Sequence, residues 1–449
     1  MDPINLETKN NFLKFIEDNM LYEILIVSWL QFLHKFYLNH RQRALIMRLV
    51  ELPKSVECVM TKEVYDKARK YDLDKLNFSN FGNIYSKLCS TVFLLGLYYH
   101  HFWLWSINLA QYFGFDDTNE ILLSGIFMFI INIIYEVIYF PLKVYSTFVV
   151  EENYGFNKQT PLLFIKDQIL KLIVCEVLTV PFLCAVTWII KNGGDYFSIC
   201  LWIFIIAASL FLMVIYPEVI APLFNKYTPL PDGELKTKIE ALAASINFPL
   251  YKLFIVDNSK RSSHSNAYMY GFHKYKRIVL FDTLVKEYYK PAEGETELQG
   301  CETDEIVAVL AHELGHWKYN HVLKGFIIGQ LCLLINIFLY GKLMNYKPMF
   351  YAFGFVDTQP TIVGFIIVTV YMLMPLNVFI KFINILLRKF EFEADKFAKS
   401  LGHGQALKSS LIKLQTDNLN YPLYDKLYSR WHHSHPPLLE RLEAIDKED

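Results

Sequence analysis

The 449-residue sequence lacks the features that mark several common classes of protein. Its formal net charge is only −1 and no dense basic block occurs, which argues against nucleic acid as a partner. The seven cysteines are scattered without a CxxC pair, so we expect small core residues in a reducing compartment or in lipid. The first apolar run is not followed by a small-residue cleavage site, so we expect no removed signal peptide.

Apolar residues are abundant instead. Hydrophobic residues make up 53% of the chain and aromatic residues 16%, which indicates membrane spans and therefore membrane lipid as a partner. Windows of about 19 residues predict seven spans. They lie near 20–38, 88–111, 121–143, 168–190, 197–217, 322–344 and 361–387. The first contains Glu23, His34 and Lys35, so an interfacial or buried helix is its alternative.

The connectors between these spans predict an orientation, because lysine and arginine favour the cytosolic side. Residues 39–85 are rich in both, whereas residues 112–120 contain neither. Continuing this alternation places 218–321 and the C-terminal tail in the cytosol and the N-terminus in the lumen. An odd number of spans requires such opposite-sided termini.

Two acidic residues, Glu136 and Glu176, fall inside predicted spans. An ionisable group there is costly unless it faces protein or water, so each suggests an internal polar cavity. The alternative is that a span end is misplaced by a turn and the side chain extends toward the interface.

A soluble insert begins after Pro217, where proline and turn residues accumulate. Residues 252–257, 267–272 and 277–282 are β-rich, and the polar turn HKYK predicts a hairpin between the last two. We therefore expect four parts. These are a membrane domain (1–217), a soluble protease insert (218–321), spans six and seven (322–387) and a C-terminal helical part (388–449).

The stretch from Thr303 to His321, TDEIVAVLAHELGHWKYNH, is predicted to be a helix that Thr303 caps and that continues into the sixth span. Residues four apart share a helix face, so His312 and His316 can both bind a tetrahedral Zn²⁺. Glu313, one step round, reaches the water that such a metal activates. An ordinary amphipathic helix with two hydrogen-bonded histidines is the alternative.

A catalytic zinc needs a third protein ligand. The extended motif HExxHxxGxxH is absent, because Tyr319 and Val322 stand where its glycine and third histidine would be. The best candidate lies in RKFEFEAD (388–395), where Glu391 and Asp395 share a helix face. One can bind zinc while the other accepts a hydrogen bond from a liganding imidazole, and we favour Glu391 as the ligand. Without the upstream motif, this run would be typical of a solvated helix start.

Several motifs together resemble the type I CAAX prenyl protease family of integral-membrane zinc metalloproteases. They are HELGH, FEFEADKFA, SSHSNAYMYGF, FVVEENYGFNKQT, IAPLFNKYTPLP and SHPPLLERL, and they cover most of the chain in the family's order. The resemblance implies a mostly α, polytopic protein of the endoplasmic reticulum membrane, and also of the inner nuclear membrane. Seven transmembrane helices would enclose a chamber, with a cytosolic α+β zinc-protease domain that has a small β-hairpin at one end.

Family members remove the last three residues from farnesylated or geranylgeranylated C-termini, and some also cut prenylated precursors further upstream. By resemblance, one zinc ion is bound by His312, His316 and Glu391. Glu313 is the general base, and Asp395 orients His312.

Three more roles follow from the same resemblance. Asn266 would contact the substrate backbone, His435 would stabilise the oxyanion, and Arg441 would hold the tail in place as part of the substrate-binding region. From the residues alone, Asn266 can equally start a strand and His435 can cap the last helix.

Other functions share some of these features. A broader quality-control protease for membrane proteins would use the same zinc chemistry, and a non-catalytic membrane scaffold or metal carrier would need the ligands but not Glu313. An intramembrane protease is less favoured, because the candidate third ligand follows Arg388 and Lys389, outside a span.

Overall fold

The computed structural model describes residues 3–271, 275–288, 299–376, 381 and 383–447. The helices of the membrane part are α1 (Pro3–Arg48), α2 (Lys62–Leu95), α3 (Tyr98–Tyr112), α4 (Glu120–Tyr145), α5 (Pro161–Asn192), α6 (Phe197–Ile215), α10 (His321–Leu343), α11 (Lys347–Ala352) and α12 (Thr361–Ile366). The others are α7 (Ala221–Phe224), α8 (Glu234–Ser245), α9 (Thr303–Lys318), α14 (Ile383–Ala398), α15 (Gly404–Asp417), α16 (Lys426–His432) and α17 (Leu438–Asp446).

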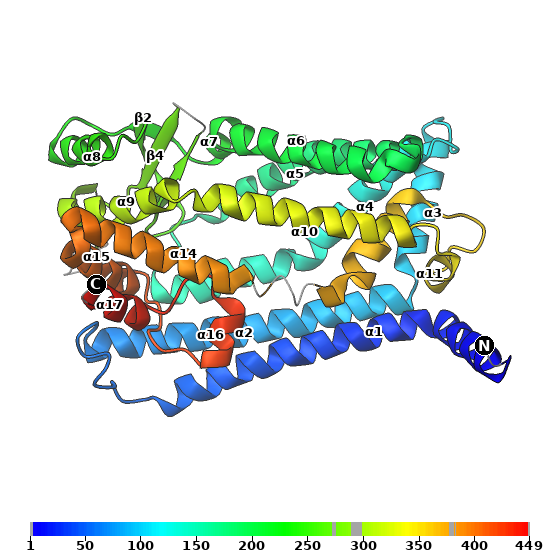
Figure 1. Ribbon diagram of the computed structural model, residues 1–449, viewed down its shortest axis with the longest axis horizontal. Coiled ribbons are helices and arrows are strands. Elements are labelled where there is room, and N and C mark those ends of the chain that lie inside the picture. Colours follow the sequence, from blue (N-terminus) through cyan, green and yellow to red (C-terminus); the bar gives the residue numbers. More distant parts are fainter. Residues whose placement is uncertain (1–2, 272–274, 289–298, 377–380, 382, 448–449) are drawn as a thin grey trace.

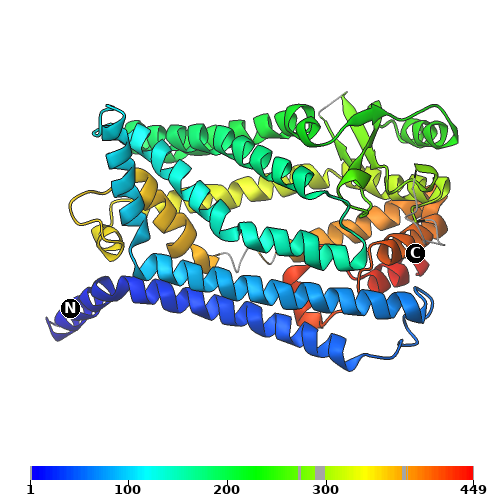
Figure 2. The same cartoon turned by 180° about the vertical axis from the view of Figure 1, so that it is seen from behind.

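The molecule is elongated, and its long helices run roughly along its length (Figures 1 and 2). The sheet, α8, α9, α15 and α17 gather at one end, which also holds the C-terminus. The start of α1 lies at the opposite end. The chain therefore concentrates its irregular and polar segments at one end of a helical framework.

Among the described residues, four helical segments are long and apolar enough to cross a membrane: 120–154, 161–192, 194–224 and 321–343. They correspond to the third, fourth, fifth and sixth predicted spans. Only 6% of the most apolar window is buried in each of the last three. A helix in a solid bundle buries the face that points toward its neighbours. The low buried share therefore means that other protein segments cover little of the surface of these three helices.

The seven-span count is not confirmed. The first predicted span lies within α1, whose 46 residues would extend about 69 Å and whose composition does not meet the same test. The second is split between α2 and α3, where Leu97 adopts a left-handed conformation with φ of 50°. The seventh begins as α12 and a π-helical turn at Ile367–Met372, and residues 377–380 and 382 lie outside the described residues.

The two acidic residues inside spans have protein partners. Lys143 lies 2.6 Å from both carboxylate oxygens of Glu136, seven residues away on α4. Asn132 of α4 donates a hydrogen bond of 3.2 Å to Glu176 of α5. Polar pairing on α4 therefore accounts for Glu136, whereas Glu176 is paired through one oxygen and its buried Oε1 has no partner among the described residues.

A four-stranded sheet forms from β1 (Tyr227–Pro229), β2 (Leu250–Val256), β3 (Ala267–Tyr270) and β4 (Lys276–Phe281) in the order β1-β2-β4-β3. The predicted antiparallel pairing of the last two strands is confirmed, although residues 272–274 of the turn lie outside the described residues. Sequence analysis missed β1, which is only three residues long. Within the described residues, β3 is therefore an edge strand.

Two contacts anchor the insert to the membrane helices. Arg261 donates two hydrogen bonds, of 2.7 and 2.9 Å, to Asp167 of α5, and a third to Asn225. His264 stacks on Phe156 with ring centroids 4.0 Å apart. The segment that leads into β3 is thus held against the start of α5 and the linker before it. The four-part division of the chain stays a prediction.

Candidate metal centre

The local sequence explains why α9 forms and which face it buries. Its buried residues Ile306, Leu310 and Leu314 join the core between the sheet and α15. The predicted cap at Thr303 is wrong, because Glu302 caps the helix and forms a reciprocal capping box with Glu305. This start orients α9 so that its HELGH segment lies against α14.

The prediction that α9 continues into the sixth span is also wrong. The helix ends at Lys318, Asn320 is left-handed with φ of 56°, and α10 begins at His321. Asparagine tolerates this conformation better than most residues. The break turns His321 back toward His316.

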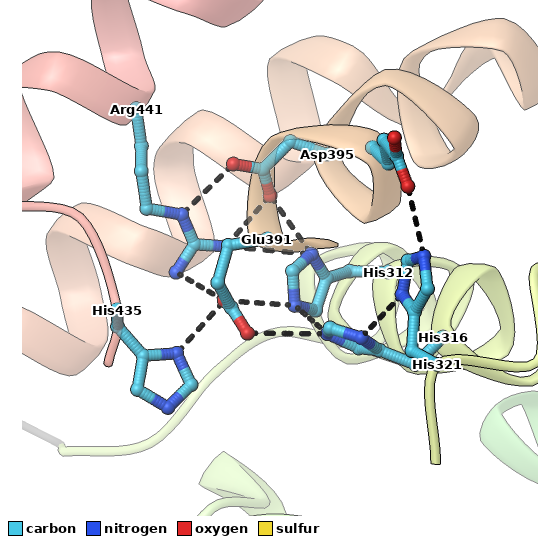
Figure 3. A network of polar contacts seen from close by, with 8 residues as sticks. His312, His316, His321, Glu391, Asp395, His435 and Arg441 are labelled. Atoms are coloured by element: carbon cyan, nitrogen blue, oxygen red, sulfur yellow. Dashed lines mark hydrogen bonds and ion pairs between the residues drawn. The ribbon is translucent and has the colours of Figure 1, made fainter. Parts of the chain in front are cut away.

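Three side chains from two distant segments converge (Figure 3). The Nε2 atoms of His312 and His316 are 3.2 Å apart, and those atoms lie 3.6 and 3.3 Å from carboxylate oxygens of Glu391. Ligands of a tetrahedral zinc, at roughly 2.0–2.1 Å from the ion, would be about 3.3 Å from one another. The imidazole pair therefore matches one edge of a zinc coordination tetrahedron, and the two oxygens of Glu391, Oε2 facing His312 and Oε1 facing His316, lie near the same spacing.

The charge of the cluster also favours a cation. One oxygen of Glu391, Oε2, is buried and accepts no hydrogen bond from any described residue, although His435 Nδ1 and Arg441 Nη1 lie 2.8 and 3.8 Å from it. Burial alone would raise the pKa of Glu391, but His312, His316 and His435 hold that pKa well below its usual range. A buried carboxylate with an unused oxygen, facing two imidazoles, suits a metal ion.

Asp395 orients the first of these imidazoles. It lies 2.8 Å from Nδ1 of His312, and Arg441 donates to both its oxygens at 2.6 and 2.8 Å. Burial raises the pKa of Asp395, yet its bonds to Arg441 and His312 keep that pKa low. Burial lowers the pKa of His312, but Asp395 and Glu391 raise it to about 9. Arg441, predicted in the substrate-binding region, is itself only 11% exposed.

A partner of the second imidazole was missed. Nδ1 of His321 lies 3.0 Å from Nδ1 of His316, and its Nε2 lies 3.0 Å from Glu393. The ring stacks on Phe390 with centroids 4.1 Å apart. Only the break after α9 brings these residues together. The signal in the sequence was a further histidine, His321, five residues after His316.

Gly315 allows the two metal-binding helices to approach closely. A Cβ at this position would lie 3.0 Å from the Cα of Ala394 on α14 and 3.2 Å from Cβ of Phe397. The glycine of HELGH therefore decides the separation between α9, which carries the imidazoles, and α14, which carries Glu391.

The remaining predicted site residues surround this centre. Glu313 is half-buried, and its side chain makes no hydrogen bond to another described residue. His435 approaches Glu391 from a loop and is 68% exposed. Asn266 precedes β3; its Oδ1 accepts from the amide of Ala267, and its carbonyl accepts from the amide of Phe281.

A membrane-spanning helical framework with a largely buried His-His-Glu centre on two packed helices is typical of a membrane metalloprotease. Comparisons with known proteins agree. A family model described as the CAAX prenyl protease N-terminal domain with five membrane helices matches residues 42–226, and the model of peptidase family M48 matches residues 229–449.

Curated relatives cover nearly the whole chain. The CAAX prenyl protease 1 homologs of Mus musculus and Homo sapiens are each 43% identical over 447 residues, covering 94% of both chains. The crystal structure of S. mikatae Ste24p superposes with a TM-score of 0.85 at 36% identity, covering 95% of this chain and 98% of that one. The chain belongs to the CAAX prenyl protease family of M48 metallopeptidases.

Proposed function

We propose that this protein is a zinc endopeptidase that removes the C-terminal aaX tripeptide from farnesylated or geranylgeranylated CAAX proteins. The observation that carries the proposal is the His312–His316–Glu391 cluster, with ligand atoms within 4.8 Å of one another, in a chain whose relatives bear this activity in their names. Cleavage of a prenylated precursor at a second, upstream position is part of the same proposal.

One Zn²⁺ per chain would be held by His312, His316 and Glu391. When bound, it would supply Lewis-acid polarisation of the scissile carbonyl and make water more acidic. Asp395 keeps His312 in the tautomer whose Nε2 is free for the metal, because its carboxylate accepts the Nδ1 proton. Arg441 supports Asp395 from behind, a geometry that favours a positioning role over direct contact with substrate.

Two side chains of the protein would carry out the proton transfer and stabilise the charge that develops during peptide cleavage. Glu313 carries a carboxylate without a competing hydrogen bond, so it can take a proton from the attacking water and pass it to the nitrogen of the departing tripeptide. His435, on an exposed loop beside the cluster, can donate to the developing oxyanion, which is worth roughly 3 kcal/mol in comparable sites.

The edge strand β3 suits an extended peptide. Main-chain pairing to such a strand recognises length and end position more than side chains, and Asn266 stands at its start. The prenyl group needs an apolar space, since each buried methylene contributes about 0.8 kcal/mol. The sparsely covered faces of α5, α6 and α10 support a chamber between the spans that would provide it.

The location follows from the same reasoning. We propose that the protein lies in the endoplasmic reticulum membrane, and also in the inner nuclear membrane, with the N-terminus lumenal and the metal centre and C-terminus cytosolic. Prenylated proteins present their C-termini at the cytosolic face, so a metal centre at that end of the molecule meets them directly.

A peptide assay tests this proposal. Purified protein should release the tripeptide from a farnesylated CAAX peptide, and either phenanthroline or Glu313→Gln should abolish release, by about 10³-fold or more for the variant. Glu313→Gln should still bind one zinc ion. Glu240→Gln, an exposed change on α8, is the matched control and should retain full activity.

Three results would contradict the proposal. Activity that survives loss of Glu313 would point to a scaffold or metal carrier with a contaminating protease. Equal cleavage of unprenylated peptides would favour a broader quality-control protease. Zinc content well below one per chain in active protein would exclude the metal mechanism.

A further inference from the structure

A groove of about 1020 Å³ lies between α1, α14, α16 and the start of α17. Two of its walls are segments where the chain changes from apolar to polar: residues 34–38 at the end of the first predicted span, and residues 385–392 on α14. The helix α16 closes another side, and Trp431 packs edge-on against His34 with ring centroids 4.4 Å apart. The groove therefore lies where the first and the seventh predicted spans give way to polar residues.

The groove is strongly cationic. Five basic side chains line it: Lys381, Arg388, Lys389, Lys426 and Arg430. The one carboxylate among its described lining residues, Glu440, lies 3.2 Å from Arg388. Lys426 and Arg430, one helical turn apart on α16, have no carboxylate within ion-pair distance among the described residues. Positive charge is thus left unbalanced.

A buried histidine beside the groove also lies among positive charges. Burial, together with the positive charges of Lys35, Lys381 and His34, lowers the pKa of His432 to about 4. An anion in the groove would relieve this repulsion between like charges.

The same groove exposes apolar surface. Tyr37, Ile385 and Leu427 line it and are 51%, 64% and 47% exposed. Basic side chains beside exposed aromatic and aliphatic groups form an amphipathic surface. A nucleic acid or a free anion would use only the charges, whereas a lipid would use both parts.

We propose that this groove binds an anionic glycerophospholipid, whose phosphate meets Lys426 and Arg430 and whose acyl chain lies along Ile385 and Leu427. Assignment to the cytosolic leaflet rests on the orientation proposed above. Lipid binding itself does not need proteolysis, so the two proposals fail independently.

The groove and the metal centre use different faces of α14. Ile385, Lys389 and Phe392 follow the i, i+4, i+7 spacing of one face, while Glu391 and Asp395 stand about a quarter turn away. Changes on α16 can therefore remove the lipid contact without touching a metal ligand.

Lipid affinity in detergent tests the proposal. Full-length protein in a neutral detergent is titrated with fluorescent phosphatidylserine and with phosphatidylcholine of the same acyl chains. Phosphatidylserine should bind about tenfold tighter. The double variant Lys426→Gln/Arg430→Gln should lose that preference, and Lys67→Gln/Lys70→Gln, which removes two exposed charges from α2, should keep it. Zinc content should be unchanged in both.

Four outcomes would overturn the proposal. The first is equal affinity for the two lipids, and the second is an equal loss of the phosphatidylserine preference in both double variants. The third is full displacement of phosphatidylserine by inorganic phosphate at matched concentration. The fourth is displacement of phosphatidylserine by a peptide with a free C-terminal acid but not by the same peptide as its C-terminal amide. The third would show a simple anion site and the last a site for the substrate's terminal carboxylate.

Discussion

At the metal centre the two liganding imidazoles have partners of different kinds. His312 faces the carboxylate of Asp395, which Arg441 fixes from the other side. His316 faces a second imidazole, that of His321, which Glu393 fixes in turn. Each pair of contacts holds Nδ1 of its liganding histidine and leaves Nε2 free toward the metal. The contacts therefore determine the tautomer and the ring orientation of His312 and of His316.

Removing the first of these partners should weaken metal binding. Asp395→Asn replaces the carboxylate that accepts from His312 Nδ1 with a neutral amide and leaves Arg441 only the more distant Glu391, 3.8 Å away, as a counter-charge, so zinc affinity should fall about 10–100-fold. Competition with a chromogenic chelator measures this. Glu443→Gln, on the exposed side of α17, is the control, and equal zinc affinity in the two variants would contradict the role.

The second partner can be tested without disturbing packing. His321→Phe keeps the stacked ring on Phe390 but removes the nitrogen that faces His316, so zinc affinity should fall about tenfold or more. His321→Asn returns an amide oxygen near the position of Nδ1 and should recover much of that loss. If Phe and Asn behave alike in chelator competition, His321 only fills space.

At the scale of elements, the site depends on two helices packed unusually closely and on one helix break. Gly315 lets α9 contact the backbone of α14, and Asn320 ends α9 so that α10 starts in a new direction. Two helices that meet at a glycine place their side chains closer than larger residues would permit.

A single methyl group should therefore disturb the centre. Gly315→Ala would push Cβ to 3.0 Å from the Ala394 backbone, which cannot move independently of its helix, so α9 and α14 should separate and zinc affinity should drop about tenfold. Gly325→Ala on α10 has nothing within 4 Å of the added Cβ and serves as the matched control. Chelator competition measures the zinc affinity of both variants. An unchanged zinc affinity in Gly315→Ala would show that close packing at Gly315 does not control the metal centre.

At the scale of the whole molecule, the polar end and the helical framework are joined at several points. Arg261 binds Asp167, and residues of the α1–α2 connection share a core with Tyr421, Leu438 and Leu442 from the C-terminal part. The metal centre is therefore held relative to the spans from both the N-terminal and the C-terminal sides.

The orientation can be measured on intact membranes. Because lysine and arginine dominate the connectors at the end of the molecule that carries the metal centre, a C-terminal tag should be digested by external protease in sealed microsomes and an N-terminal tag should be protected. Digestion of both tags from the same side would contradict both the orientation and the odd number of spans.

The sequence alone indicated much of this molecule. The spacing of HELGH, the pairing of Glu391 with Asp395 on one face and the β3–β4 hairpin depend on local periodicity, which neighbouring residues determine. The apolar runs of α4, α5, α6 and α10 are similarly local. Their length and composition required no knowledge of distant contacts.

The tertiary structure alone decided what lies between these segments. No local pattern predicts that Arg441 fixes Asp395, because that contact joins parts remote in the chain. Nor does one predict that His321 turns back to His316 or that the second predicted span divides at Leu97, because each depends on a backbone conformation that packing imposes. Sequence determined which groups could hold a metal. Packing of α9 against α14 determined that they meet.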